Sequence, residues 1–128
     1  ELNILIQYFR MNKPLEPILK KIKKFRDERD WKKFHNPKDM AEAIVIEASE
    51  LLELFLWKSQ KESQNFLKNK KNHEEVSDEL ADIMVFLMEF ADNFGIDLEK
   101  AIEKKLKKNA SKYPVEKSRG KATKYTKL

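Results

Sequence analysis

The sequence predicts an all-α protein, and three features of its composition support that class. The chain has 128 residues, which suffices for one domain. Two glycines cannot supply the turns of an all-β protein, and the 38% of charged residues well exceeds the usual quarter. The absence of cysteine excludes disulfides, zinc fingers and thiol catalysis, and suits a reducing compartment. We therefore expect a soluble helical protein of the cytoplasm.

The first two helices are predicted over residues 15–34 and 37–58. In both ranges apolar residues recur every three or four positions, which is typical of a helix with one buried side. The boundary between them is set by Asn36, a favoured N-cap, and by Pro37, which suits the first position of a helix.

The second half of the chain is predicted to hold two more helices. Residues 59–71 are polar and rich in lysine, which indicates a loop with a fragment of helix. The third helix covers residues 72–94, with Asn72 and Glu75 as a capping pair, and Gly95 ends it. The fourth runs from Asp97 to about residue 113, because the following proline blocks its continuation.

These elements divide the chain into a core and two flanking segments. Residues 1–12, in which Met11 falls, are expected to be an N-terminal extension outside the core, and residues 13–114 form the core domain. Residues 115–128 form a basic tail with too few apolar residues to fold alone, so we expect it to be disordered or to lie on a partner. The apolar stretches are shorter than the roughly 20 residues of a spanning helix, so no membrane association is expected.

The excess of positive charge raises the question of nucleic acid binding. The formal net charge is +5, and the isoelectric point is near 9.3. The lysines are spread over residues 20–24, 68–71, 104–108 and the tail, with no recognition helix or RNA-binding motif. A nucleic acid partner is therefore not expected, although a non-enzymatic basic helical module that binds nucleic acid stays as an alternative.

The second helix carries an acidic pair beside its apolar residues. Its expected core stripe consists of Ala41, Ile44, Val45, Ala48, Leu51, Leu52 and Phe55. Ala43, Ile46 and Leu54 form a second apolar flank, on which Glu47 and Glu50 lie roughly 60° apart. A helix that is apolar on two sides is buried between partners, so we expect these glutamates in a partly dry groove.

The third helix repeats this plan. Its expected core stripe consists of Val76, Leu80, Ile83, Leu87, Phe90 and Phe94, with Val85 and Met88 on the other side. Glu79 and Asp82 stand at the same spacing of three residues as the acids of the second helix. Two successive helices thus each offer an acidic pair at the edge of an apolar face.

Four carboxylates in one groove indicate a metal site. Burying like charges together is costly unless a cation compensates them. Oxygen ligands without His or Cys favour Mg²⁺ or Mn²⁺ over zinc. The two histidines, His35 and His73, do not follow a glutamate at the spacing that a di-iron bundle requires. Solvated acids, or a metal-dependent structural bundle without catalysis, stay as alternatives.

Three stretches carry a resemblance to a known family. They are Phe25-Arg26-Asp27-Glu28-Arg29-Asp30-Trp31-Lys32-Lys33-Phe34-His35-Asn36-Pro37, then Glu47-Ala48-Ser49-Glu50-Leu51 with Phe55-Leu56-Trp57, and Glu79-Leu80-Ala81-Asp82-Ile83. Together they resemble the MazG-type nucleotide pyrophosphohydrolases, specifically the dCTP pyrophosphatase branch. The likeness covers about residues 20–128. One departure is Leu56, where this branch often has Gln.

The resemblance implies a fold, an activity and a cofactor. The fold is a MazG-like bundle of about four helices per chain, completed by oligomerisation as a homodimer or homotetramer. The activity is Mg²⁺-dependent hydrolysis of a (deoxy)nucleoside triphosphate between its α and β phosphates, with Mn²⁺ as a substitute metal. dCTP or a modified dCTP is the favoured substrate, in nucleotide-pool housecleaning. A broad-specificity or dUTP-directed pyrophosphatase of the same fold is the nearest alternative.

The motif match also implies residue roles. Glu47, Glu50, Glu79 and Asp82 would hold the metal, and either Glu47 or Glu50 would serve as general base. The residues expected at the base are Trp31, His35 and Trp57, and those expected at phosphate or sugar are Lys105, Asn109, Lys112 and Tyr113.

Overall fold

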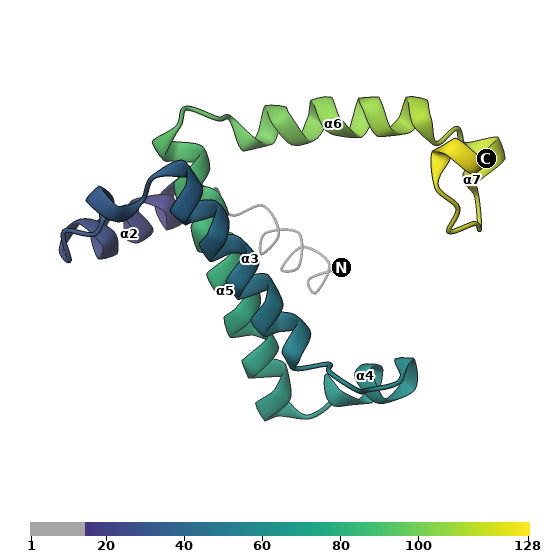
Figure 1. Cartoon of the computed structure of the whole chain (residues 1–128), viewed down its shortest axis with the longest axis horizontal. Coiled ribbons are helices and arrows are strands. Elements are labelled where there is room, and N and C mark those ends of the chain that lie inside the picture. Colours follow the sequence, from purple (N-terminus) through teal and green to yellow (C-terminus); the bar gives the residue numbers. More distant parts are fainter. Residues whose placement is uncertain (1–14) are drawn as a thin grey trace, which may run out of the picture. The chain divides into compact units, whose positions relative to one another are not determined.

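The computed structural model describes residues 15–128, all of whose regular elements are helical. The elements are α2 (Leu15–Asp27), the 3₁₀ turn η1 (Lys32–Phe34), α3 (Pro37–Glu53), α4 (Gln60–Phe66), α5 (Lys70–Asn93), α6 (Leu98–Lys112), α7 (Val115–Ser118) and the 3₁₀ turn η2 (Tyr125–Lys127). Figure 1 shows their order along the chain. The predicted all-α class is confirmed: α2, α3, α5 and α6 are the four predicted helices, α4 is the helical fragment expected within residues 59–71, and α7 is a short addition. The expected extension at residues 1–12 lies outside the described residues.

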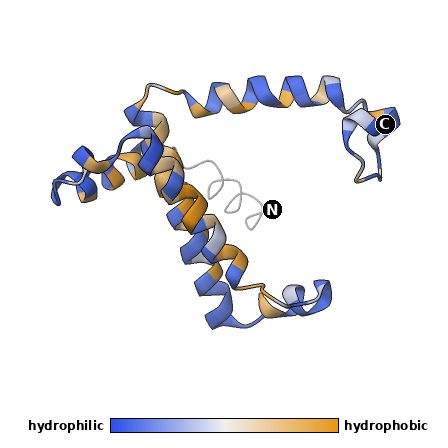
Figure 2. Cartoon of the chain, in the orientation of Figure 1, coloured by the Kyte–Doolittle hydropathy of each residue, from blue (hydrophilic) through white to orange (hydrophobic). Residues whose placement is uncertain are grey.

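The described residues form two compact units, residues 15–90 and residues 91–128. In the first unit, α3 and α5 run side by side in opposite directions, and α4 lies in the connection between them (Figure 1). Apolar residues are frequent along both long helices, as Figure 2 shows. This helical pair is the framework on which the acidic residues stand.

The helix boundaries follow from local hydrogen bonds. Asn36 caps α3, because its side-chain oxygen accepts the Asp39 N–H at 3.0 Å. Ser59 and Glu62 form a capping box at the start of α4. The prediction that Asn72 caps the third helix was wrong. Asn69 does so instead, since its side chain accepts the N–H groups of the two residues 71 and 72.

The first and second helices are shorter than predicted. α2 ends at Asp27 rather than near residue 34, because Asp30 adopts a left-handed conformation with φ of 53°. The Trp31 N–H then donates to the Arg26 carbonyl at 3.2 Å, which closes the helix end. α3 ends at Glu53, and the turns that follow lead to Trp57, whose φ is 62°.

The packed side of α3 differs from the expected core stripe. Met40 is buried, and the half-buried residues of this helix are Ala43, Ile44, Glu47 and Leu51. Two residues of the expected stripe, Val45 and Leu52, are 66% and 68% exposed. The helix has two apolar sides, and the single chain covers neither completely, since Ile46 beside Glu47 is also 54% exposed.

The helix α5 shows the same departure from its expected core stripe. Val76 and Met88 are buried, whereas Leu80 is 52% exposed and Leu87 is 37% exposed. In the described part of the chain, both long helices therefore leave an apolar side uncovered.

The second unit begins with the last turn of α5. Gly95, with φ of 67°, ends this helix as predicted, and the Ile96 N–H donates to the Ala91 carbonyl at 2.8 Å. Asp97 caps α6 by accepting the Lys100 N–H. The tail was expected to lack structure of its own, but it contains α7 and η2. The Tyr125 ring packs edge to face on Tyr113, at 5.8 Å between centroids, which anchors it.

No helix among residues 15–128 has both the length and the apolar character needed to cross a membrane.

Candidate active site

The acidic pairs of the two long helices meet in the first unit. Glu47 and Glu50 of α3 and Glu79 of α5 each offer a carboxylate oxygen, and these three oxygens lie within 4.8 Å of one another. Asp82 stands one turn after Glu79, and its charge acts on both Glu47 and Glu79. The spacing of three residues places each pair on one side of its helix, and the antiparallel packing brings the two sides together.

The electrostatics of this cluster are unbalanced. Burial raises the pKa of Glu47, and repulsion from the three other carboxylates raises it further. The pKa of Glu79 is raised by burial and then by the charges of Glu50 and Asp82. The buried Oε2 atom of Glu79 has no hydrogen-bond partner among the described residues. An unpaired buried oxygen within a group of carboxylates is the donor set that fits a divalent cation.

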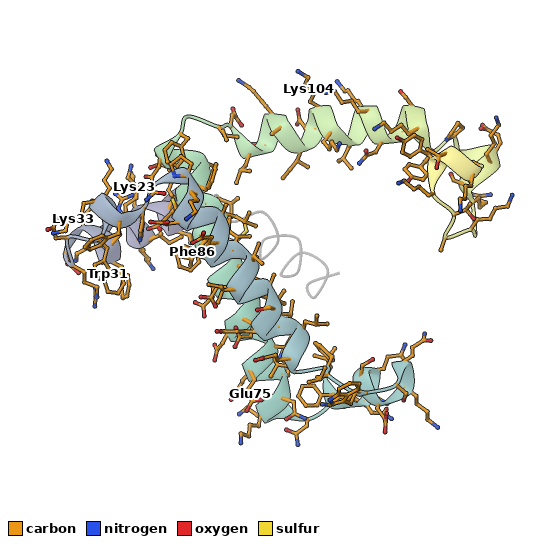
Figure 3. The ribbon with its side chains drawn as sticks, in the orientation of Figure 1. Lys23, Trp31, Lys33, Glu75, Phe86 and Lys104 are labelled. Atoms are coloured by element: carbon orange, nitrogen blue, oxygen red, sulfur yellow. The ribbon has the colours of Figure 1, made fainter. Side chains whose placement is uncertain are left out.

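A cavity of about 490 Å³ adjoins this cluster, which is within the range of small-molecule sites. Its lining comes from α2, the Trp31–His35 turn, α3 and α5, and comprises Lys21, Ile22, Phe25, Arg26, Trp31, His35, Glu47, Asp82, Val85, Phe86 and Glu89. The rings of Phe25 and Trp31 meet edge to face at 5.8 Å. Figure 3 labels Trp31 and Phe86, which come from different elements of the lining. The aromatic walls suit the face of a flat ring, and the carboxylates beside them suit a cation.

A second group of charged residues, which sequence reasoning missed, also lines the cavity. Arg26 is 2% exposed and Glu89 is 3% exposed. The Nδ1 atom of His35 lies 3.1 Å from Oε2 of Glu89, although the angle is not that of a well-formed hydrogen bond. Arg26 also binds Asp27 at 2.8 Å. Burial raises the pKa of Glu89, and the charges of His35 and Arg26 oppose that rise.

A weak signal for Glu89 was present in the sequence. Glu89 follows Asp82 by seven residues, which places both on one side of a helix, and it stands between Met88 and Phe90. A lone charge between apolar residues on a core helix is the pattern that indicates a buried carboxylate.

The remaining predicted site residues are placed elsewhere. Trp57 is 93% exposed at the end of the turns after α3 and does not line the cavity. Lys105, Asn109 and Lys112 lie on α6 in the second unit, and Tyr113 follows it. The ammonium of Lys112 lies 5.0 Å from the ring of Tyr125. The roles expected for these four residues stay predictions.

Comparisons with known proteins place this geometry in context. Residues 43–128 match a family model described as the MazG-like family. The chain is 39% identical over 117 residues to dCTP pyrophosphatase 1 of Rattus norvegicus, covering 88% of this chain and 69% of that protein. The Mus musculus protein of the same name gives the same identity and coverage. A crystal structure of a pyrophosphatase from Archaeoglobus fulgidus is 40% identical, with a TM-score of 0.73, over 78% of this chain and 92% of that one.

Proposed function

The chain belongs to the MazG-like family and is a nucleotide pyrophosphatase, and we propose that it hydrolyses dCTP or a modified dCTP to the monophosphate and pyrophosphate with Mg²⁺. The observation that carries this proposal is the meeting of three carboxylates within 4.8 Å beside a cavity that two of the four acids line. The finer part of the proposal, the cytosine base, follows the activity for which the related proteins are named. The resemblance found in the sequence is confirmed at the level of the family.

The four acids are the residues that would hold the metal. When bound there, Mg²⁺ supplies positive charge that neutralises the phosphate oxygens and the leaving pyrophosphate. Without that charge, the carboxylates of the chain repel a triphosphate. Glu47 and Asp82 line the cavity, so they would face the nucleotide, whereas Glu50 and Glu79 do not line it and would complete the cluster.

The chain's own residues supply the proton acceptor and the orientation of the substrate. Attack of a water on the α phosphorus breaks the bond to the bridging oxygen, and the water's proton passes to a carboxylate. We assign this role to Glu47, because it lines the cavity and its raised pKa makes it a better acceptor. Lys21 lines the same cavity and adds a mobile positive charge for the phosphates.

We further propose that the chain acts as a homodimer or homotetramer in the cytoplasm. Val45, Leu52 and Leu80 are each more than half exposed, which is costly for a monomer in water. A second copy of the chain would cover these sides and bury the long helices between partners. Light scattering at micromolar concentration is expected to give a dimer or tetramer, and a monomer would contradict this part of the proposal.

A panel of nucleoside triphosphates with Mg²⁺ tests the activity. We expect dCTP to give dCMP and pyrophosphate faster than dUTP, TTP and the purine nucleotides do, as resolved by anion-exchange chromatography. Equal rates for all nucleotides, or faster dUTP turnover, would favour the broad-specificity or dUTP-directed alternative. A nucleoside diphosphate and orthophosphate as products, or no turnover, would contradict the proposed reaction.

A further inference from the structure

Glu89 occupies the end of the cavity away from the acidic cluster. It lies on α5 seven residues after Asp82, and both side chains line the cavity. Seven residues of α-helix are two turns, or about 10 Å along the axis. Val85 and Phe86 line the stretch between them. The cavity therefore has a carboxylate at each end and an apolar middle, over about the length of a nucleoside.

The burial of Glu89 is unusual for its chemistry. Its side chain is 3% exposed, and a buried carboxylate is stable only when it is paired. His35 lies 3.1 Å from one of its oxygens, and the charge of Arg26 acts on it as well. Each carboxylate oxygen has two lone pairs, so Glu89 keeps acceptor capacity beyond this contact. A compensated carboxylate facing a cavity is a hydrogen-bond acceptor for a neutral ligand.

The position of Glu89 relative to the acidic cluster indicates which part of a nucleotide it meets. The triphosphate belongs at the cluster that would hold the cation, and the apolar, aromatic middle suits the sugar edge and the face of the base. The outer edge of the base then reaches Glu89. At that edge cytosine presents a 4-amino group, whereas uracil and thymine present a carbonyl oxygen.

We infer that Glu89 is the specificity-determining residue of this site, accepting a hydrogen bond from the 4-amino group of cytosine and disfavouring bases with a 4-carbonyl. This inference rests on the proposed function, because it assumes that the nucleotide lies with its phosphates at the acidic cluster. Carboxylate side chains accept from the cytosine amine in other recognition sites. A carbonyl in the same place sets two acceptors against each other and leaves both unpaired.

Glu89, His35 and Arg26 could instead have a purely structural role, in which they only hold α5 against α2 and the Trp31–His35 turn. The two readings differ in their consequence for catalysis. A structural residue affects all substrates alike, whereas a base-reading residue changes the ratio between dCTP and dUTP. The ratio is therefore the informative quantity.

Glu89→Gln tests the inference, with Glu74→Gln as the control. Gln has the same shape and can rotate its amide to donate to a carbonyl, so both bases become acceptable. Glu74 lies on the same helix, is exposed, and pairs only loosely with Lys70 at 4.0 Å. The preference in kcat/KM for dCTP over dUTP is expected to fall at least about tenfold in Glu89→Gln and to stay unchanged in Glu74→Gln.

Calorimetric binding of dCMP and dUMP to the same proteins separates base reading from catalysis. The wild type is expected to bind dCMP more tightly, and Glu89→Gln to lose that preference. If the wild type hydrolyses no nucleotide but shows this Glu89-dependent preference, the proposed function fails and the inference stands. If the preference survives in Glu89→Gln, or if the wild type binds neither monophosphate, the inference is overturned. Should Glu89→Gln not fold, Glu89→Asp withdraws the carboxylate by one methylene, and the preference must fall in that variant too.

Discussion

The two ends of the cavity carry carboxylates in opposite electrostatic situations. At one end the lining residue Glu47 approaches Glu50 and Glu79, and the pKa values of Glu47 and Glu79 are raised by burial and by neighbouring carboxylates. At the other end Glu89 is compensated by His35 and Arg26. The first end is unbalanced, because its carboxylates repel one another, whereas the second is better balanced, because His35 lies beside Glu89 and the charge of Arg26 acts on it. An unbalanced end suits metal and phosphate, and a balanced end suits the neutral edge of a base.

The largest expected effect is on turnover at the unbalanced end. Glu50→Gln removes one of the clustered carboxylates while keeping the size of the side chain. Metal-ion stabilisation of the transition state contributes several kcal/mol, so turnover of dCTP should fall by at least about 1,000-fold. Glu53→Gln, one turn further along α3, is the matched control and should retain activity. Full activity of Glu50→Gln, with its helical circular dichroism intact, would remove Glu50 from the cluster's function.

The next effect is on stability at the balanced end. Glu89→Leu removes the carboxylate whose charge acts on the buried Arg26, and leaving a buried charge uncompensated typically costs about 3 kcal/mol or more. Urea unfolding is expected to show this loss in the free energy of unfolding. A variant as stable as the wild type would mean that the buried Arg26 does not depend on Glu89.

Removing a carboxylate from the unbalanced end should increase the stability of the protein, in contrast to Glu89→Leu. Without metal, Glu47→Gln relieves repulsion and should raise the melting temperature by about a degree or two at pH 7. The pKa of Glu47 is raised in the folded state, so wild-type stability falls as pH rises from the unfolded pKa through the folded one. The advantage of Glu47→Gln should therefore shrink toward pH 4. An advantage that grows as the pH falls would contradict the raised pKa.

The smallest expected effect is on stability at Asp27. Here removing the carboxylate should destabilise the protein, as at Glu89 and unlike at Glu47. The side-chain hydrogen bond from Arg26 lowers the pKa of Asp27, so its contribution to stability is present above its unfolded pKa. That contribution is lost as pH falls through the lowered pKa. Asp27→Asn should slightly lower the melting temperature at pH 7 and leave it unchanged in strong acid. An equal loss at both pH values would assign the effect to packing rather than charge.

The sequence predicted the acidic cluster better than it predicted the packing of the helices. A spacing of three residues places Glu47 with Glu50, and Glu79 with Asp82, whatever the tertiary structure. The packed side of α3 could not be predicted in this way. The helix is apolar on two sides, and its composition does not show which of them packs inside the chain. The structure half-buries Ile44 and Glu47 and leaves Val45 and Leu52 exposed.

The balanced end was missed for a different physical reason. Periodicity detects repeated residues, whereas Arg26 and Glu89 are single buried charges from helices far apart in the sequence. Both line one cavity with Trp31 and His35, which follow the left-handed residue Asp30, and sequence reasoning placed that turn inside a longer helix. Because the end of α2 was predicted too late, this part of the site was not predicted.

The difference between the two ends is tested most directly by titrating Mn²⁺, which takes the same oxygen ligands as Mg²⁺, into the metal-free protein. Bound and free ion can be separated by the electron paramagnetic resonance signal of free Mn²⁺. Saturable binding is expected in the wild type and in Glu89→Gln, with at least about tenfold weaker binding in Glu79→Gln. Equal binding in all three proteins, or none in the wild type, would contradict the assignment of the cation to the acidic cluster.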